Sequence, residues 1–282
     1  MNNSVTRRTF LAASAAALSA QWASAAATTH FDFYAMDTGL RGPDVPTLED
    51  KVKLPKDLGY WGIDYTLDHQ QLPHLLELLD RAEVQLACVY LSPTLGEKPD
   101  SRLAESIKRM KGRSTRLELA IQSKKLNPSD RAGDDAGVEL INRVSDMCAD
   151  LGPVVSIYPH TGMWTERVQD GVRLARLCGR KNAGTNFNLV HWSWVKQDEP
   201  LEKVLEQSLP FLKAVSINGL DGRKIVPLDE GDYDVTAFMR TLGRIGYDGP
   251  VGFQGYGIPG PSRKLLERSM RKWREIQTAL ST

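Results

Sequence analysis

The sequence lacks an excess of charge of either sign. Its 282 residues include 36 Lys and Arg against 35 Asp and Glu, which gives a net charge of +1. Proteins that bind nucleic acid are expected to carry a basic face, so this balance gives no support to a nucleic-acid partner. Cysteine is also scarce, and three cysteines in so long a chain exclude a small domain held together by disulfides. With 41% hydrophobic and 25% charged residues, the composition is that of an ordinary globular protein.

Long hydrophobic runs are absent too, and only one short run stands out, near the beginning of the chain. Arg7 and Arg8 precede an alanine-rich stretch at 10–20, which is followed by an Ala-Ser-Ala triplet. These are the parts of a secretory signal peptide, and Thr-Arg-Arg-Thr-Phe-Leu resembles the twin-arginine export motif. We predict a signal peptide at 1–27, a mature domain at 28–282 without a membrane span, and a periplasmic or extracellular location. A helix of the mature protein or an uncleaved anchor are the alternatives, although the run is too short to span a bilayer.

Short apolar, β-branched or aromatic runs alternate eight times with longer helical patterns. The predicted strands are 31–36, 61–65, 84–91, 116–122, 154–158, 183–188, 212–217 and 251–254. The helical patterns lie at 47–58, 71–82, 101–111, 134–151, 166–179, 200–208, 234–245 and 262–280. Strict alternation predicts an α/β protein with a parallel sheet and helices outside it. Eight units in about 250 residues indicate a single (β/α)8 TIM barrel. An open doubly wound sheet is the alternative, but no glycine-rich dinucleotide motif follows the first strand.

Neutral hydrogen-bonding side chains gather at the predicted carboxyl ends of the later strands. TIM barrels build their active sites at these ends, and alternation along a strand shows which residues point inward. In the fourth strand, Leu117, Leu119 and Ile121 suit the helix side, which turns Gln122 inward. The same rule gives a set of candidate substrate-binding residues: Gln122, Tyr158, Asn186, Asn188, Asn218 and Gln254. Such groups suit a polyhydroxylated ligand such as a sugar, although each could instead be a structural group that holds a loop.

His160 and His191 are the candidate catalytic residues. They follow the fifth and sixth strands, which are neighbours in a barrel, so we expect them at one mouth. Two histidines there can act as acid and base near neutral pH, and a structural role is the alternative for either one. Trp164, Trp192 and Trp194 lie in the same loops and are candidates for stacking on a sugar or for packing the loops. Carboxylates near strand ends could also supply an acid or a base: Asp37, Asp64, Glu166 and Asp221.

Five short motifs follow one another along the chain. They are TLEDK at 47–51, LGYWGID at 58–64, YPH at 158–160, FNLVH at 187–191 and GYDGPVGFQ at 246–254. In this order they resemble the xylose isomerase-like barrels of the sugar phosphate isomerase/epimerase family, from about Phe31 to the last helix. The resemblance implies one divalent metal (Mn, Mg, Zn or Co), held by two Glu, one Asp and one His at strand ends. It also implies that the Glu pair acts as acid and base in isomerisation or epimerisation.

The resemblance further implies where the metal ligands fall: near Tyr158, Asn188, Ser216 or Asn218, and Gln254. Each carboxylate expected there is a neutral group in this sequence. Hard cations prefer carboxylates, and transition metals prefer imidazole or thiolate. If a metal is bound, His160 and His191 are therefore its candidate ligands. His191 also matches a family histidine that contacts substrate.

We therefore expect an exported enzyme that moves a proton next to a carbonyl of a sugar or keto-sugar, by isomerisation, epimerisation or elimination from a keto-sugar glycoside. His160 or His191 would move the proton, and positioned amides would hold hydroxyls or polarise the carbonyl. Export favours a free sugar or glycoside as the partner, and the sequence leaves oligomer formation open. A non-catalytic sugar-binding or accessory barrel that has lost the metal site is the main alternative. A glycoside hydrolase needs two facing carboxyls, which strands four to eight do not supply at their inward ends.

Overall fold

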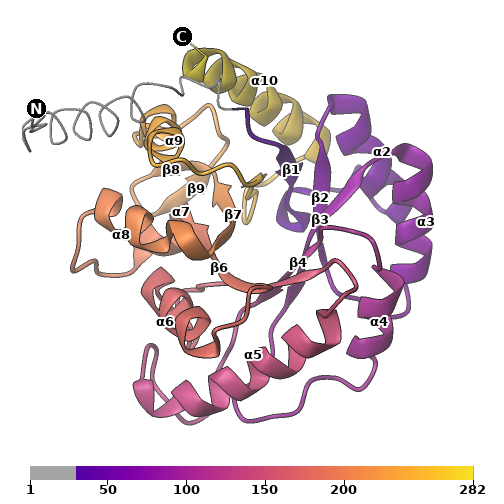
Figure 1. The fold of residues 1–282 in the computed structure, drawn as a ribbon. Helices are drawn as coiled ribbons and strands as arrows, with labels where there is room; N and C mark the ends of the chain where they lie inside the picture. Colours follow the sequence, from indigo (N-terminus) through magenta and orange to yellow (C-terminus); the bar gives the residue numbers. More distant parts are fainter. Residues whose placement is uncertain (1–29, 282) are drawn as a thin grey trace, which may run out of the picture.

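Eight parallel strands form a closed barrel in the computed structural model of the protein, which describes residues 30–281 (Figure 1). The strands are β1 (Phe33–Ala35), β2 (Gly62–Thr66), β3 (Gln85–Leu91), β4 (Arg116–Leu119), β5 (Val154–Ile157), β6 (Ala183–Asn188), β7 (Leu212–Ile217) and β10 (Val251–Phe253). They follow one another around the barrel, and β10 pairs with β1 to close it. The predicted TIM barrel is thus confirmed, whereas the predicted signal peptide at 1–27 lies outside the described residues.

Helices surround the barrel, and each helix packs one apolar face against the strands. They are α2 (Leu48–Leu58), α3 (Leu72–Ala82), α4 (Leu103–Arg109), α5 (Asp134–Cys148), α6 (Val168–Cys178), α8 (Leu201–Ser208), α9 (Val235–Arg244) and α10 (Ser262–Leu280). In α3, for example, the buried residues Leu72, Leu75, Leu76 and Leu79 recur at helical spacing. Helix α10 packs against both α9 and α2, so the last helix completes the outer ring (Figure 1). Among residues 30–281, no helix has both the length and the apolar character needed to cross a membrane.

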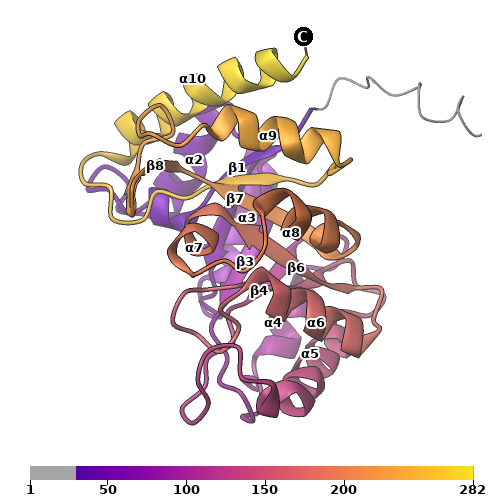
Figure 2. The same ribbon diagram turned by 90° about the vertical axis from the view of Figure 1, so that its left-hand side faces the viewer.

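Two further elements follow strand ends and help to build the mouth of the barrel. Helix α7 (Leu189–Trp194) begins directly after β6, because the Asn188 side chain accepts a hydrogen bond from the backbone N–H of His191 at 3.1 Å. The antiparallel pair β8 (Gly219–Asp221) and β9 (Lys224–Val226) follows β7. Figure 2 shows α7 and β8 on the same side of the barrel. The alternation of strands and helices did not predict either element.

The interior of the barrel is more polar than the layer between strands and helices. Leu117 and Leu119 on β4 are buried among the apolar residues that pack under the helices, as the alternation predicts. Glu118 lies between them on the strand, so its side chain faces the opposite side, and it is fully buried. In the register of the sheet Glu118 pairs with Ser156 of β5. The barrel therefore places polar side chains directly beneath the mouth, where a ligand would bind.

Candidate active site

A cavity of about 340 Å³ lies at the carboxyl ends of the strands, where TIM barrels hold their active sites. Its volume falls in the range of small-molecule sites. Residues that follow or end β1, β2, β3, β5 and β10 line it, together with α7 and one residue of β9. The titratable and hydrogen-bonding residues described below that line it are Asp37, Arg41, Asp64, Tyr158, His160, His191 and Gln254. Elements far apart in the sequence thus converge on a single space.

His160 and His191 meet in this cavity. Their ring centroids lie 4.1 Å apart and their ring planes are tilted by 41°. The loop after β5 positions His160 through a backbone hydrogen bond from its N–H to the carbonyl of Thr165, at 2.9 Å. The first turn of α7 positions His191, whose N–H binds the capping side chain of Asn188. The structure therefore brings the two predicted catalytic residues together.

The hydrogen bonds of the two rings assign opposite tautomers to them. Nδ1 of His160 lies 2.9 Å from the carbonyl oxygen of Thr161, so Nδ1 must carry the proton and Nε2 is left as an acceptor. Nδ1 of His191 accepts instead, because the backbone N–H of Thr161 donates to it at 3.4 Å. The Thr161 hydroxyl lies 3.2 Å from the same nitrogen. The proton of a neutral His191 ring is therefore on Nε2, where it can be donated.

Both histidines favour the neutral form. Burial lowers the pKa of His160 below its ordinary value, against the opposing effect of its hydrogen bond to Thr161. Burial lowers the pKa of His191 to about 3, and the neighbouring His160 contributes in the same direction. At neutral pH the cavity therefore contains one imidazole nitrogen that can accept a proton and, close by, one that can donate a hydrogen bond.

A neutral hydrogen-bonded triad occupies the positions at which the family resemblance implies metal ligands. The Asn188 side-chain nitrogen donates to the Tyr158 hydroxyl at 2.6 Å and to Oε1 of Gln254 at 2.9 Å. Burial keeps the pKa of Tyr158 well above its ordinary value, so its hydroxyl stays neutral. Within residues 30–281, no group of three or more His, Cys, Asp or Glu is placed to hold a metal ion. Amides and a phenol that bind one another are a poor donor set for a divalent cation, so the residues present do not fit the implied metal.

Charged groups lie at one side of the cavity. Asp37 accepts hydrogen bonds from Lys51 at 2.8 Å, from Arg41 at 2.7 Å and from the Thr66 hydroxyl at 3.1 Å. Burial alone would raise the pKa of Asp37, but the hydrogen bonds from Lys51 and Arg41 outweigh burial and lower it. The Arg41 side chain is about half exposed. It can therefore contact a ligand while it holds Asp37.

Two further carboxyl groups near the cavity are buried, and burial raises the pKa of both. Asp64 lines the cavity from β2 and is 4% exposed, and Glu118 of β4 is fully buried. Burial raises the pKa of Glu118 to about 7. Burial, followed by the nearby Glu118 and Asp37, also holds the pKa of Asp64 well above its ordinary value. Asp64 was a candidate from the sequence, whereas Glu118 was not, although it lies four residues before Gln122 in the fourth strand and alternation turns it to the same inward side.

Several predicted binding residues lie outside the cavity. The side-chain nitrogen of Asn186 donates to Glu118 beneath the mouth, and that of Asn218 donates to the carbonyl of Gly219 at 2.8 Å. Both side chains are buried, so they support the barrel interior and the turn before β8. Gln122 is exposed on a neighbouring loop, where its nitrogen donates to the carbonyl of Ser92 at 3.4 Å. The 340 Å³ cavity is thus lined by fewer of the candidate substrate-binding residues than the sequence predicted.

The tryptophans divide between packing and the cavity wall. Trp164 is 1% exposed and its indole N–H donates to the carbonyl of Asp130, so the ring has no free face for a sugar. Trp192 packs near Phe187, with ring centroids 6.2 Å apart, and does not line the cavity. Trp194 does line it, edge-on to His191. Stacking on a ligand is therefore open to Trp194, whereas Trp164 packs the loops, which was the alternative given for it.

The other carboxylates named from the sequence have different places. Asp37 lines the cavity, as described above, whereas Glu166 accepts a hydrogen bond from the backbone N–H of Gly162 at 2.8 Å and holds that loop. Asp221 ends strand β8 and is exposed. The carboxyl groups at the cavity are therefore Asp37 and Asp64, which come from the first two strands and not from strands four to eight.

Comparison with known proteins gives consistent results. The family model described as xylose isomerase-like TIM barrel matches residues 52–276. A ketose 3-epimerase of Arthrobacter globiformis is 30% identical over 158 residues, which are 54% of this chain. The matched region spans about half, 52%, of that relative's length.

Two solved structures illustrate the shared fold. The D-allulose 3-epimerase of Methylomonas sp. in complex with D-allulose superposes with a TM-score of 0.70 at 16% identity, over 88% of this chain and 97% of that one. The 3-keto-D-glucoside 4-epimerase of E. coli gives a TM-score of 0.66 at 13% identity, over 88% of this chain and all of that one, 100%. At such low identity, these likenesses show the fold alone.

Proposed function

The chain belongs to the xylose isomerase-like TIM barrel family, and from that premise we propose that it is an enzyme that transfers a proton next to the carbonyl of a sugar or keto-sugar. The observation that carries the proposal is the His160–His191 pair, whose rings hold opposite tautomers 4.1 Å apart in the cavity. A base and a hydrogen-bond donor at one place are what enolisation requires. The proposal does not involve a metal, because the triad of Tyr158, Asn188 and Gln254 does not fit one.

The first step follows from the two tautomers. Nε2 of His160 takes the proton from the carbon next to the carbonyl, and the electrons of that C–H bond form a C=C bond. The carbonyl oxygen becomes an enolate oxygen, which accepts a hydrogen bond from Nε2–H of His191. Protonation of the same carbon from its opposite face, by a second acid or after the enolate turns over, gives an epimer. Protonation of the former carbonyl carbon, with transfer of the neighbouring hydroxyl proton to the enolate oxygen, gives an isomer. Loss of a substituent from the adjacent carbon gives elimination instead.

The remaining lining residues suit an uncharged polyhydroxylated ligand. Arg41 and Asp37 offer a donor and an acceptor at one side of the cavity, and Trp194 offers an aromatic edge beside His191. Asp64 also lines the cavity, and its raised pKa favours the protonated carboxyl, which can donate a hydrogen bond. Relatives with this fold include epimerases of free ketoses and of a keto-glucoside, which supports the same class of substrate here.

We also propose that residues 1–27 direct the chain to export through the twin-arginine route. The test is to express the full chain with its own leader in a bacterium that has this route, beside an Arg7→Lys/Arg8→Lys double variant. The parent is expected in the periplasmic fraction and the double variant in the cytoplasm. Equal cytoplasmic retention of both would overturn the proposal.

A sugar-binding barrel without catalysis is the second candidate. The observation that favours it is the loss of every carboxylate at the implied ligand positions, where the neutral triad now lies. Such a protein would still recognise hydroxyl groups through the cavity, but the His160–His191 pair would then serve only to hold the loops.

Solvent exchange separates the two candidates. The protein is incubated in D₂O with free ketoses and with methyl 3-keto-β-D-glucoside, and deuterium at the carbon next to the carbonyl is measured by NMR. We expect incorporation with the parent, with or without prior treatment with EDTA, and loss of at least 100-fold in rate in His160→Gln. Sugar binding without exchange would support the binding protein, and exchange that His160→Gln leaves unchanged would overturn the assigned base.

A further inference from the structure

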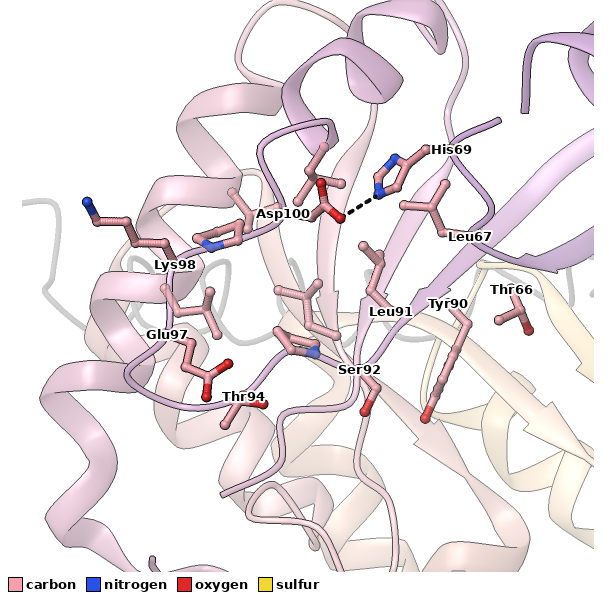
Figure 3. A pocket seen from close by; sticks show the side chains of 16 residues that line it. Thr66, Leu67, His69, Tyr90, Leu91, Ser92, Thr94, Glu97, Lys98 and Asp100 are labelled. Carbon is pink, nitrogen blue, oxygen red and sulfur yellow. Dashed lines mark ion pairs between the residues drawn. The ribbon is translucent and has the colours of Figure 1, made fainter. Parts of the chain in front are cut away.

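A second cavity, of about 380 Å³, adjoins the first. It lies between the ends of β2 and β3, the loop that follows β3, and helices α4 and α5 (Figure 3). Thr66 and Tyr90 line both cavities. The Tyr90 ring meets Tyr158 edge-on, with centroids 5.6 Å apart, which places it at the boundary beside the neutral triad. A ligand longer than one sugar ring can therefore extend from the first cavity past Tyr90 into the second.

The floor of the second cavity is apolar. Leu103, Leu119, Leu140 and Val144 form its buried part. Leu67 and Leu91 are partly exposed and complete it, and they project into the space shown in Figure 3. Water on such a surface is released when an apolar group covers it, so burial of a hydrocarbon or aryl group here is favourable.

Three polar residues at the edges of this cavity, His69, Glu97 and Asp100, are held by hydrogen bonds or ion pairs. Nδ1 of His69 lies 2.8 Å from the Ser106 hydroxyl, and its Nε2 lies 3.6 Å from the Asp100 carboxylate (Figure 3). Glu97 accepts from Lys124 at 2.7 Å. His69, Asp100 and Glu97 are thus engaged, and the buried surface that is left for a ligand is the leucine floor. Lys98 also lines the cavity, but it is exposed at the edge and forms no part of this apolar floor.

We propose that this second cavity holds the apolar aglycone of a glycoside whose oxidised sugar lies between His160 and Tyr90. The inference rests on the proposed function and narrows its substrate to a keto-glycoside with an aryl or alkyl group. An aglycone in this cavity would also supply the leaving group that elimination needs. His160 removes the proton next to the carbonyl, a C=C bond forms towards the neighbouring carbon, and the bond from that carbon to the aglycone oxygen breaks. The aglycone oxygen takes up the proton and leaves as a phenol or alcohol, so no oxidant or reductant is consumed.

Such a substrate must already carry a carbonyl on its sugar. A separate oxidoreductase that converts one ring hydroxyl of a glycoside to a ketone therefore has to act first. The enzyme proposed here would then release the aglycone.

The test compares binding of phenyl β-D-glucoside and methyl β-D-glucoside by calorimetry, since neither can react. Parent protein is measured beside Thr94→Trp, which places a ring in the second cavity, and Leu91→Asp, which puts a charge on its floor. Lys125→Trp is the matched control, because this exposed residue does not line the cavity. Circular dichroism establishes that each variant is folded. We expect the phenyl glucoside to bind at least 10-fold more tightly than the methyl glucoside in the parent and in Lys125→Trp, and about equally in the two cavity variants.

Other outcomes separate this inference from the proposed function. Equal binding of the two glucosides by the parent would overturn the aglycone site but not the proposal that the first cavity binds the sugar. A phenyl preference that survives in both cavity variants would place the aglycone elsewhere and would also overturn the inference. Absence of binding by either glucoside, together with absence of deuterium exchange on methyl 3-keto-β-D-glucoside, would overturn both proposals.

Discussion

The rings of His160 and His191 lie 4.1 Å apart and are both oriented by one residue, Thr161. Its carbonyl accepts from Nδ1 of His160, and its backbone N–H donates to Nδ1 of His191. Because a peptide group has one donor and one acceptor, this contact gives the two rings different tautomers. The asymmetry of the pair is thus set by backbone groups, which a side-chain substitution at Thr161 does not remove.

The two histidines should therefore respond differently to the same substitution. Glutamine in place of His160 removes the base, and we expect the exchange rate to fall between 10² and 10⁴-fold. Glutamine in place of His191 keeps a donor, because its side-chain nitrogen can still bind an enolate oxygen, and we expect a loss of about 10-fold. The measurement is kcat for deuterium incorporation in both variants. Equal losses would contradict the assigned roles.

The pH dependence of the reaction should report the lowered pKa of His160. The base works only when neutral, so the rate rises with pH through its pKa and is flat above it. Since burial lowers that pKa from its ordinary value of 6.5, the half-maximal point of kcat/KM should lie below pH 6.5. The measurement is kcat/KM from pH 4.5 to 8.5, with circular dichroism to show that the protein stays folded. A half-maximal point at or above pH 6.5 would show that the base is another group or an exposed histidine.

The fold was predictable from the sequence because hydrophobic pattern alone specifies it. All eight predicted strands are present, since each is a short apolar run bounded by helical patterns. Helix α7 was missed because it depends on one side-chain cap, from Asn188, and begins inside what still looks like a strand. The pair β8 and β9 was missed because a turn at Gly222 joins its strands, with no helical pattern between them, so the strand–helix alternation does not reveal them.

The candidate site was predictable only in part. Alternation correctly turned Tyr158, Asn188 and Gln254 inward, but it could not show that they bind one another. It also could not separate Trp194, which lines the cavity, from Trp164, which is buried and packs closely against Gly133 and Gly137. Such differences depend on the paths of loops, which no periodic pattern encodes.

Glu118 should make folding stability depend on pH. The folded protein binds its proton up to a pKa of about 7, whereas the unfolded chain releases it near the ordinary value of 4.5. Between these values the folded state holds more protons, so stability falls as pH rises from 4.5 to 7, by about 3 kcal/mol for this group. Glu118→Gln keeps an acceptor for Asn186 and stays neutral, so the part of the pH dependence that Glu118 contributes should vanish, while the part due to Asp64 remains. Urea unfolding at pH 5 and pH 8 measures it.

An exposed glutamate provides the control for that measurement. Glu139 lies on the surface of α5 with a side chain that is 63% exposed. Glu139→Gln should leave the difference between pH 5 and pH 8 as it is in the parent. If Glu118→Gln behaved in the same way, Glu118 would have to be ionised in the folded protein.

Trp164 should contribute to stability and not to ligand binding. Its ring lies so close to Gly133 and Gly137 that a methyl group at either position would contact it at 2.7 Å or less. Trp164→Ala would leave a cavity in this packed region, at a cost of about 3–5 kcal/mol in the free energy of unfolding. Trp194→Ala is the matched comparison, and it should weaken sugar binding with little effect on stability. Urea unfolding and calorimetry together measure both effects, and the opposite assignment would restore Trp164 as a binding residue.

Carboxylates restored to the triad should create the metal site that its present residues do not support. Asn188→Asp together with Gln254→Glu would place two anionic oxygens where amides now bind one another, close to His191. Hard cations bind such groups far more strongly than amides. We expect the double variant to retain about one Mn²⁺ per chain after gel filtration, as measured by elemental analysis, and the parent and the Asn188→Leu/Gln254→Leu control to retain none. Retention by the parent at the same level would contradict the metal-independent proposal, because the neutral triad would then be a competent ligand set.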